Sequence, residues 1–572
     1  MCFQVVEETD LAATMRDGVV LRADVYRPKA DGKFPALLNR TPYGKAPKRE
    51  VGRRLAELGY GVVIQDVRGR YASEGTFRPG LYSAEHDDAE DGYDSVEWAA
   101  ELPWSTGRVG TFGCSYDAWV QWELAHTRPP HLVTMLASGI AANLLDRELS
   151  GVLRVGRVLD WTVNNLSVDT GRRLGDPWKA RTPEEARRLW LERDRMKWLW
   201  FLPLMEIPDE VMPGMGAYWR RWLIDHASDH FRFLEKHREI DVPVLNMTGW
   251  YDQQIGTIKQ FTGMVANGRT ERARQNQHLI VGPWTHTLTD LNRKVGDVDF
   301  GPEALRDFYE IADAWFSHWL KGDGAEGLGW PPVQVFVMGD NAWRAENEWP
   351  LARTDYTDFY LHSGGGANTV VGDGVLTRQP PGDERPDAYA YDPRDPVMTL
   401  YTSGGQHAPM DQRPLEGRQD VLVYATPPLE TPVEVTGPIE VRLWAASSAR
   451  DTDFVAKLID VWPDGFAQEL CHGIVRARYR ESFDTPSTIE PGEAYEYTIQ
   501  VNPVSNVFKQ GHRIRLDISS SDFPNFDRNH NTGGDDYREA VLQTARQTVF
   551  HDAAHPSRVI LPVIPSSAGQ GV

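Results

Sequence analysis

Alternating hydrophobic and polar positions mark strands and helices along the first 140 residues of the chain. Residues 13–26 alternate on both sides of Asp17-Gly18, a pair typical of tight turns, and so predict a β-hairpin. Apolar runs at 35–39 and 61–65 predict buried strands, and residues 91–102 predict a helix. Because strands alternate with helices here, the pattern favours a parallel, doubly wound α/β sheet.

The pattern changes between residues 143 and 240, where strand signals disappear. Thr182 followed by Pro183 is typical of a helix start, and a tryptophan-rich run follows at 190–204. We interpret this segment as a helical insertion of the kind that often covers an active site. Most of its tryptophans are expected to pack in a hydrophobic core. Sheet-like runs return at residue 241, and an amphipathic helix is predicted at about 303–320.

The last part of the chain predicts a domain built from β-strands. Many short strands without helices between them, separated by Gly, Pro and Asp turns, are typical of a sandwich or jelly roll. The predicted strands lie at residues 332–338, 358–361, 420–425, 433–445, 452–461, 495–501 and 513–519. Residues 527–532 have the composition of a calcium loop, but Thr532 and Arg538 stand where that loop needs Gly and Glu, which excludes it.

Composition excludes several classes of function. The 572 residues are enough for roughly three to four domains. A formal net charge of −21 argues against nucleic acid and anionic membrane surfaces as partners. Only three cysteines occur, which excludes a disulfide framework and suits a reducing compartment. The start of the chain has no signal-peptide pattern and no apolar run is long enough to span a membrane, so we expect a cytoplasmic protein.

A candidate nucleophile lies between a predicted strand and a predicted helix. Residues 107–112 predict the strand, residues 119–125 the helix, and Ser115 lies in the turn between them. A serine on such a turn has its hydroxyl exposed above the sheet, and N–H groups at the helix start can hold a developing oxyanion. The match to G-x-S-x-G is incomplete because Asp117 stands at the second Gly position. The turn alone therefore leaves open an ordinary structural serine.

Two later apolar runs end in the acid and the base that a serine nucleophile needs. Residues 242–252 end in Asp252, and residues 278–286 end in His286. Catalytic groups collect at the carboxyl ends of strands in open α/β sheets. The order Ser, Asp, His is that of the α/β-hydrolases, with His286 as general base and Asp252 as the group that orients it.

Four short segments together resemble one family of serine hydrolases, which includes cocaine esterases, X-Pro dipeptidyl-peptidases and α-amino acid ester hydrolases. The similarity covers nearly the whole chain, including its β-rich end. The segments are Pro42-Tyr43-Gly44, Gly113-Cys114-Ser115-Tyr116, Gly249-Trp250-Tyr251-Asp252 and Gly282-Pro283-Trp284-Thr285-His286.

The resemblance implies an α/β fold with a known division into parts. We expect an α/β-hydrolase core at 1–142 and 241–330, a helical cap insertion at 143–240, and a C-terminal β jelly-roll-like domain at 331–572. It implies an oxyanion hole made by the Tyr116 backbone N–H and the Tyr43 hydroxyl. It also implies that no metal and no organic cofactor takes part.

The sequence departs from the family pattern at two places. Ala118 replaces a Gly that usually follows the nucleophile turn, and the small side chain is expected to preserve close helix–strand packing. Gln254 and Ile255 stand where relatives acting on α-amino esters carry acids that bind the substrate ammonium, which disfavours that substrate class. Gln254 also disfavours a flat aromatic acyl group and indicates a substrate with hydrogen-bonding groups. Trp161 in the insertion is a further candidate pocket residue.

The leading hypothesis is a serine hydrolase that cleaves small-molecule carboxylic esters through an acyl-enzyme. The same catalytic groups would also serve an amide-cleaving relative, either an X-Pro dipeptidyl-peptidase or an acylase. A third alternative, an inert core joined to a ligand-binding β-domain, is disfavoured because the three catalytic residue types and the tyrosine are all present. A homodimer through an edge of the β-domain is an alternative to a monomer that the sequence leaves open.

Overall fold

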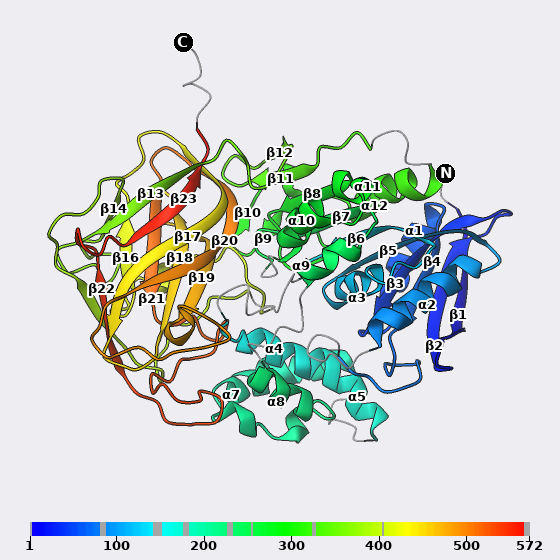
Figure 1. Ribbon diagram of the computed structural model, residues 1–572, viewed down its shortest axis with the longest axis horizontal. Helices are drawn as coiled ribbons and strands as arrows, with labels where there is room; N and C mark the ends of the chain where they lie inside the picture. The colour runs from blue at the N-terminus through cyan, green and yellow to red at the C-terminus, as the bar shows by residue number, and fades with distance from the viewer. Residues whose placement is uncertain are drawn as a thin grey trace, which may run out of the picture.

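The computed structural model divides into three parts: an α/β core, a helical cap and a β domain (Figure 1). The core carries strands β1 to β12, the cap lies between β6 and β7, and the β domain carries β13 to β23. The structure describes residues 3–79, 87–140, 151–175, 182–225, 233–252, 256–322, 328–402 and 405–565.

The core is built on one ten-stranded sheet in the order β1-β2-β4-β3-β5-β6-β7-β8-β11-β12. The strands from β4 to β11 in that order are parallel, and β2 and β12 run antiparallel to them at either side. This confirms the predicted α/β fold. The bounds are β1 Val5–Thr14, β2 Val20–Pro28, β3 Phe34–Thr41, β4 Gly61–Asp66, β5 Ser105–Cys114, β6 Leu132–Ser138, β7 Val244–Gly249, β8 Gln277–Gly282, β11 Val333–Val337 and β12 Ala342–Glu346.

Helices pack on the core sheet, and a small hairpin of β9 Lys294–Val295 and β10 Val298–Asp299 follows β8. The 3₁₀ turns of the core are η1 Ala46–Lys48 and η9 Pro302–Ala304, and a π-turn, η10 Ser317–Lys321, follows α12. The helices are α1 Arg49–Glu57, α2 Asp88–Glu101, α3 Tyr116–Ala125, α10 Gly256–Asn267, α11 Glu271–Gln275 and α12 Phe308–Phe316.

Two sequence-based boundaries in the core need correction. The helix expected from residue 303 begins only at Phe308, because Leu305 is extended and the Asp307 side chain caps the helix by accepting the Tyr309 N–H at 2.7 Å. The strand at 332–338, placed in the β domain, is β11 and pairs in parallel with β8. The core sheet therefore continues beyond residue 330, as far as Glu346.

The cap consists of short helices with π-helical turns between them. Thr182 starts α6 as predicted, since its side chain accepts the Glu185 N–H at 3.2 Å. Trp190, Trp219 and Trp222 are fully buried, which agrees with a packing role for most cap tryptophans. The bounds are α4 Val155–Trp161, η4 Thr162–Leu166, α5 Ser167–Arg173, α6 Pro183–Leu189, η5 Trp190–Asp194, α7 Arg195–Leu199, η6 Leu204–Glu206, η7 Asp209–Val211, α8 Gly216–Asp225, α9 Phe233–Lys236 and η8 His237–Glu239.

The β domain is an eleven-stranded sheet that closes on itself, because β23 pairs with both β13 and β17. Two 3₁₀ turns, η11 Arg413–Leu415 and η12 Ala477–Tyr479, join its strands. The predicted C-terminal β domain is thus confirmed. The bounds are β13 Asp355–His362, β14 Val375–Thr377, β15 Asp387–Tyr391, β16 Leu422–Ala425, β17 Val433–Ser447, β18 Asp453–Val461, β19 Ala467–Arg476, β20 Tyr495–Phe508, β21 Arg513–Ser519, β22 Ala545–Phe550 and β23 Arg558–Val563.

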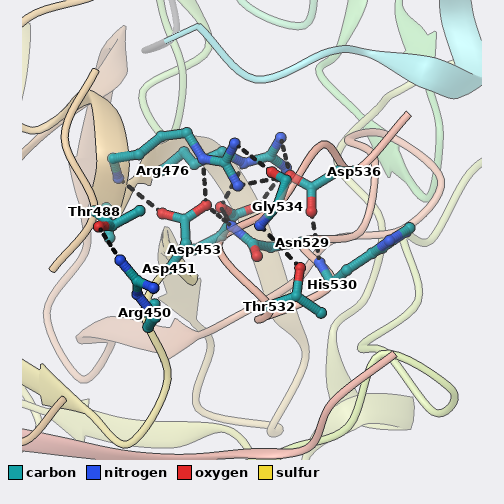
Figure 2. Close-up of polar contacts among 12 residues, drawn as sticks. Arg450, Asp451, Asp453, Arg476, Thr488, Asn529, His530, Thr532, Gly534 and Asp536 are labelled. Carbon is teal, nitrogen blue, oxygen red and sulfur yellow. Dashed lines mark hydrogen bonds and ion pairs between the residues drawn. The ribbon is translucent and has the colours of Figure 1, made fainter. Parts of the chain in front are cut away.

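A buried ionic cluster fixes the loop after β21 (Figure 2). The guanidinium of Arg476 donates to Asp453 at 2.8 and 2.9 Å and to Asp527 at 2.8 Å, and lies 3.4 Å from Asp536. The Asp527 carboxylate at the start of the calcium-like segment is therefore neutralised by an arginine.

No described helix has the length and apolar character needed to cross a bilayer.

Candidate active site

Ser115 occupies a strained turn between strand β5 and helix α3. Its backbone has φ 64° and ψ −126°, a conformation that side-chain-bearing residues rarely adopt. A Cβ added at Gly113 would lie 2.4 Å from the Asp117 Cβ, so the chain can turn this tightly only with Gly there. The predicted strand–serine–helix turn is therefore present, with Ser115 half-buried at its apex.

The departures at Asp117 and Ala118 are accommodated by local contacts. Asp117 is buried, and its carboxylate accepts Lys48 Nζ at 2.6 Å and Asn39 Nδ2 at 3.2 Å. The lysine neutralises the charge, and both contacts tie the first turn of α3 to the segment around β3. Ala118 is fully buried.

Asp252 and His286 meet in space from the loops that follow β7 and β8. His286 Nδ1 lies 3.1 Å from both carboxylate oxygens of Asp252. The Asp252 side chain is 1% exposed and that of His286 is 28% exposed. Thr248 Oγ1 donates to Asp252 Oδ2 at 3.3 Å. The structure thus brings together the two residues that the sequence placed at separate strand ends.

The two loops are also joined to each other through their backbones. Tyr251 N–H donates to the Trp284 carbonyl at 3.1 Å, and Trp250 N–H donates to the Gly282 carbonyl at 2.9 Å. Gly139, just after β6, completes this packing: a Cβ there would lie 2.6 Å from Asp252 Oδ2 and 2.9 Å from His286 Nδ1. Sequence reasoning missed Gly139, since a single Gly after an apolar run carries no distinguishing signal.

The second imidazole nitrogen faces the nucleophile turn. His286 Nε2 lies 4.0 Å from Cys114 Sγ, and Cys114 immediately precedes Ser115. Burial lowers the pKa of His286, whereas the charges of a Cys114 thiolate and of Asp252 raise it, with a net increase.

Tyr43 presents its hydroxyl to the same turn. The hydroxyl lies beside the Ser115 side chain and accepts Trp161 Nε1–H at 3.1 Å. Burial and the charge of Asp117 raise the pKa of the Tyr43 phenol well above its ordinary value, so the group stays protonated and able to donate. The Tyr116 N–H belongs to the first turn of α3, where amides point out of the helix end.

Aromatic side chains of the cap lie against this group. Trp161, the last residue of α4, stacks on Tyr116 with ring centroids 6.3 Å apart and meets Tyr218 edge-on at 6.1 Å. Trp161 thus lies beside Tyr43 and Tyr116. The other two pocket candidates, Gln254 and Ile255, lie outside the described residues.

Among the described residues, two clusters have metal-ligand chemistry, and neither includes a predicted site residue. They are His407, Glu469 and His472, and His530, Asp536 and Glu539. In the first cluster both imidazoles lie 3.0 Å from one Glu469 oxygen, and Lys457 Nζ lies 3.7 Å from the other. A lysine already supplies the countercharge that a metal ion would bring, so this group is a buried ion-pair network.

Comparisons with known proteins show which family the chain resembles. The family model for X-Pro dipeptidyl-peptidase (S15 family) matches residues 17–288, and that for the X-Pro dipeptidyl-peptidase C-terminal non-catalytic domain matches residues 329–560. The cocaine esterase of Rhodococcus sp. (strain MB1 Bresler) is 38% identical over 587 residues, which cover 97% of this chain and 98% of the esterase.

Two solved structures share the architecture along its full length. An aminopeptidase from the marine sediment archaeon Thaumarchaeota archaeon is 26% identical with a TM-score of 0.82, covering 98% of this chain and 97% of that one. An α-amino acid ester hydrolase has a TM-score of 0.80 at 24% identity over the same shares, and supports the fold. The chain therefore belongs to the X-Pro dipeptidyl-peptidase (S15) family, and within it is a serine hydrolase of carboxylic esters.

Proposed function

We propose that the protein hydrolyses small-molecule esters through an acyl-enzyme formed on Ser115, with His286 as general base and Asp252 as the orienting acid. One observation carries the proposal. The imidazole is held with Nδ1 at 3.1 Å from Asp252, while Nε2 faces the strained turn that presents Ser115. This is the arrangement in which a carboxylate fixes the tautomer of a histidine that activates a serine.

The first half-reaction forms the ester of Ser115. Asp252 accepts the Nδ1–H of His286, which leaves Nε2 as a proton acceptor. Nε2 takes the Ser115 proton while Oγ attacks the substrate carbonyl carbon, and the carbonyl π electrons move to its oxygen. The Tyr43 hydroxyl and the Tyr116 N–H donate to that oxyanion. Collapse breaks the bond to the leaving alcohol, which takes the proton from His286 Nε2.

The second half-reaction restores the enzyme. A water molecule gives its proton to His286 Nε2 and attacks the acyl carbon of the Ser115 ester. The resulting oxyanion again accepts hydrogen bonds from Tyr43 and Tyr116. Collapse releases the carboxylic acid, and Ser115 Oγ recovers a proton from His286.

Charge pairing in the cap supports an uncharged acyl group. Asp160 accepts Arg195 Nε at 2.9 Å and Trp190 Nε1 at 2.7 Å. Asp169 accepts Arg172 at 3.1 Å and the Tyr71 N–H at 2.9 Å. These two carboxylates already hold partners, so neither is set up to anchor the ammonium group of a dipeptide or an α-amino ester. The indole of Trp161 and its aromatic neighbours offer an apolar surface instead.

Covalent labelling tests the nucleophile directly. A fluorophosphonate probe is expected to label the wild type and not Ser115→Ala. Ser138→Ala is the matched control, because Ser138 ends the neighbouring strand β6 and donates to the Thr287 carbonyl. Labelling lost in Ser138→Ala but kept in Ser115→Ala would contradict the assignment. Absence of labelling in the wild type would favour an inert core.

A substrate panel tests the bond that is cleaved. Acetyl, benzoyl, glutaryl and glycyl-prolyl groups are offered as matched phenyl esters and anilides. Ester turnover that disappears in Ser115→Ala, with the glycyl-prolyl anilide untouched, would support the proposal. Preferential cleavage of an anilide would instead assign the protein to the amide-cleaving members of its family.

A further inference from the structure

The hydroxyl of Tyr43 receives a hydrogen bond from the cap. Trp161 Nε1 lies 3.1 Å from the Tyr43 oxygen. An indole N–H can only donate, so the Tyr43 oxygen must be the acceptor. With an oxygen lone pair engaged by the indole, the Tyr43 O–H is directed away from Trp161, toward the side on which Ser115 lies. The contact therefore fixes the direction of a proton that would otherwise rotate.

Trp161 is itself held firmly at the end of α4. The preceding residue, Asp160, binds Arg195 and Trp190 of the cap at 2.9 and 2.7 Å. Near the start of α4, Gly156 N–H donates to the Pro524 carbonyl of the β domain at 2.8 Å. The helix that carries the indole is thus anchored on two sides, and the ring is packed between aromatic side chains.

A buried arginine ties this helix to the Tyr43 segment. Arg70 is fully buried, and its Nε donates to the carbonyl of Pro42, the residue before Tyr43, at 2.8 Å. Its two terminal nitrogens donate to the carbonyls of Leu166 and Asn165, each at 2.8 Å. These carbonyls belong to the π-helical turn η4, which directly follows Trp161. One guanidinium thus bonds the segment that carries Tyr43 to the turn that directly follows Trp161.

We infer that the cap completes the oxyanion hole, with Trp161 as a positioning residue that aims and strengthens the hydrogen bond given by Tyr43. The inference rests on the proposed role of Tyr43 in that hole. As charge develops on the substrate oxygen, the Tyr43 proton shifts toward it and the Tyr43 oxygen becomes a stronger acceptor. The bond from Trp161 then strengthens in the transition state more than in the ground state, which raises kcat.

A double-mutant cycle tests this coupling. Trp161→Phe keeps an aromatic ring and removes the N–H, and is expected to lower kcat roughly 5- to 10-fold with little change in KM. Tyr43→Phe is expected to lower kcat roughly 10²- to 10³-fold. In the Tyr43→Phe background, Trp161→Phe should cost almost nothing further, because the acceptor oxygen is gone.

The control removes a similar indole bond elsewhere in the cap. Trp219 is fully buried, and its Nε1–H donates to the Leu204 carbonyl at 3.0 Å. Trp219→Phe should leave kcat near the wild-type value, or lower it by the same factor in both Tyr43 backgrounds. Affinity for a small alkyl boronic acid, which forms a tetrahedral adduct on the serine, should fall in Trp161→Phe by the factor that kcat loses.

Each outcome decides between the inference and the proposed function. If Tyr43→Phe slows turnover and the factors by which the two substitutions lower kcat simply multiply, Trp161 acts only through packing. The inference is then overturned, while the proposed role of Tyr43 in the oxyanion hole is supported. If Tyr43→Phe turns over like the wild type, both fall. Should Trp161→Phe melt at a lower temperature, benzothienylalanine at position 161 replaces the indole with an N–H-free isostere, and wild-type kcat in that protein would overturn the inference.

Discussion

Gly139 offers the sharpest test of how closely the acid and the base must pack. It has φ 53°, and a Cβ at this position would lie 2.6 Å from Asp252 Oδ2 and 2.9 Å from His286 Nδ1. Ordinary van der Waals contact would require the new methyl group or the carboxylate to move by about 0.8 Å. A misplacement of about 1 Å in a catalytic array can cost roughly 10²-fold. Gly139→Ala is therefore expected to lower kcat by about 10²-fold with a small change in KM.

The assay is steady-state hydrolysis of p-nitrophenyl acetate, with thermal unfolding measured in parallel. Gly175→Ala is the matched control, because Gly175 also has a positive φ, 73°, yet a Cβ there would meet nothing within 4 Å. Both variants carry the backbone cost of about 1–2 kcal/mol for a left-handed alanine, and only Gly139→Ala carries the clash. Equal kcat in the two variants would refute the claim that the pair needs this close packing.

Three further results are expected. Asp252→Asn should fold and lose about 10⁴-fold in kcat, and near-wild-type turnover would identify another acid. Arg70→Met should remove on the order of 3–5 kcal/mol of stability, measured by unfolding in guanidinium chloride, because it leaves buried carbonyls unpaired. The control Arg172→Met changes a side chain that is 61% exposed and should shift the midpoint of that unfolding curve little. In a pH series, kcat/KM should rise as His286 loses its proton, since only neutral imidazole can act as base. Because the pKa of His286 is raised, that rise should lie above the pH range in which a free imidazole titrates; burial also raises the pKa of Tyr43, and an alkaline decline that Tyr43→Phe abolishes would contradict this.

The candidate catalytic residues could be identified in the sequence because each has a local signal. Strands β7 and β8 are six residues long and wholly buried, and both appear in the sequence as short, mainly apolar runs. Asp252 and His286 follow these runs within a few residues. Ser115 lies between a buried strand and a helix, and the sequence signals of both elements continue up to the turn that holds it. Parallel strands bring their carboxyl ends to one edge of the sheet, and the strand order β5-β6-β7-β8 places the ends that carry these three residues near one another.

The contacts that tune the site had no such signal. Trp161 and Tyr43 are 118 positions apart, and hydrophobic periodicity says nothing about which indole meets which hydroxyl. The role of Arg70 depends on carbonyls exposed by a π-helical turn, which propensity does not predict. Tyr43 itself was identified through family resemblance, because a tyrosine in a turn is ordinarily just half-buried.

Strand β19 was missed for a different reason. Its ten residues are all buried, but Glu469 and His472 interrupt the apolar pattern that marks a buried strand. Those side chains are tolerated inside because Lys457 and Asp522 pair with them or with each other in the same cluster. The sequence pattern shows the polar residue but not the distant partner that neutralises its charge. β11 was assigned to the wrong sheet for a similar reason, because a short apolar run does not indicate which strands it pairs with.

The β domain also contacts the loop that carries Asp252. Tyr251, the residue before Asp252, accepts Gln468 Nε2 at 3.1 Å and donates to the Glu469 carbonyl at 3.3 Å. The acid's loop is thus bonded to β19, while the Tyr43 segment is bonded to the cap. Strand ends place the catalytic groups approximately, and contacts from the two added domains set their final directions. The parts of the site that the sequence could not reveal are therefore those that depend on assembly of the whole chain.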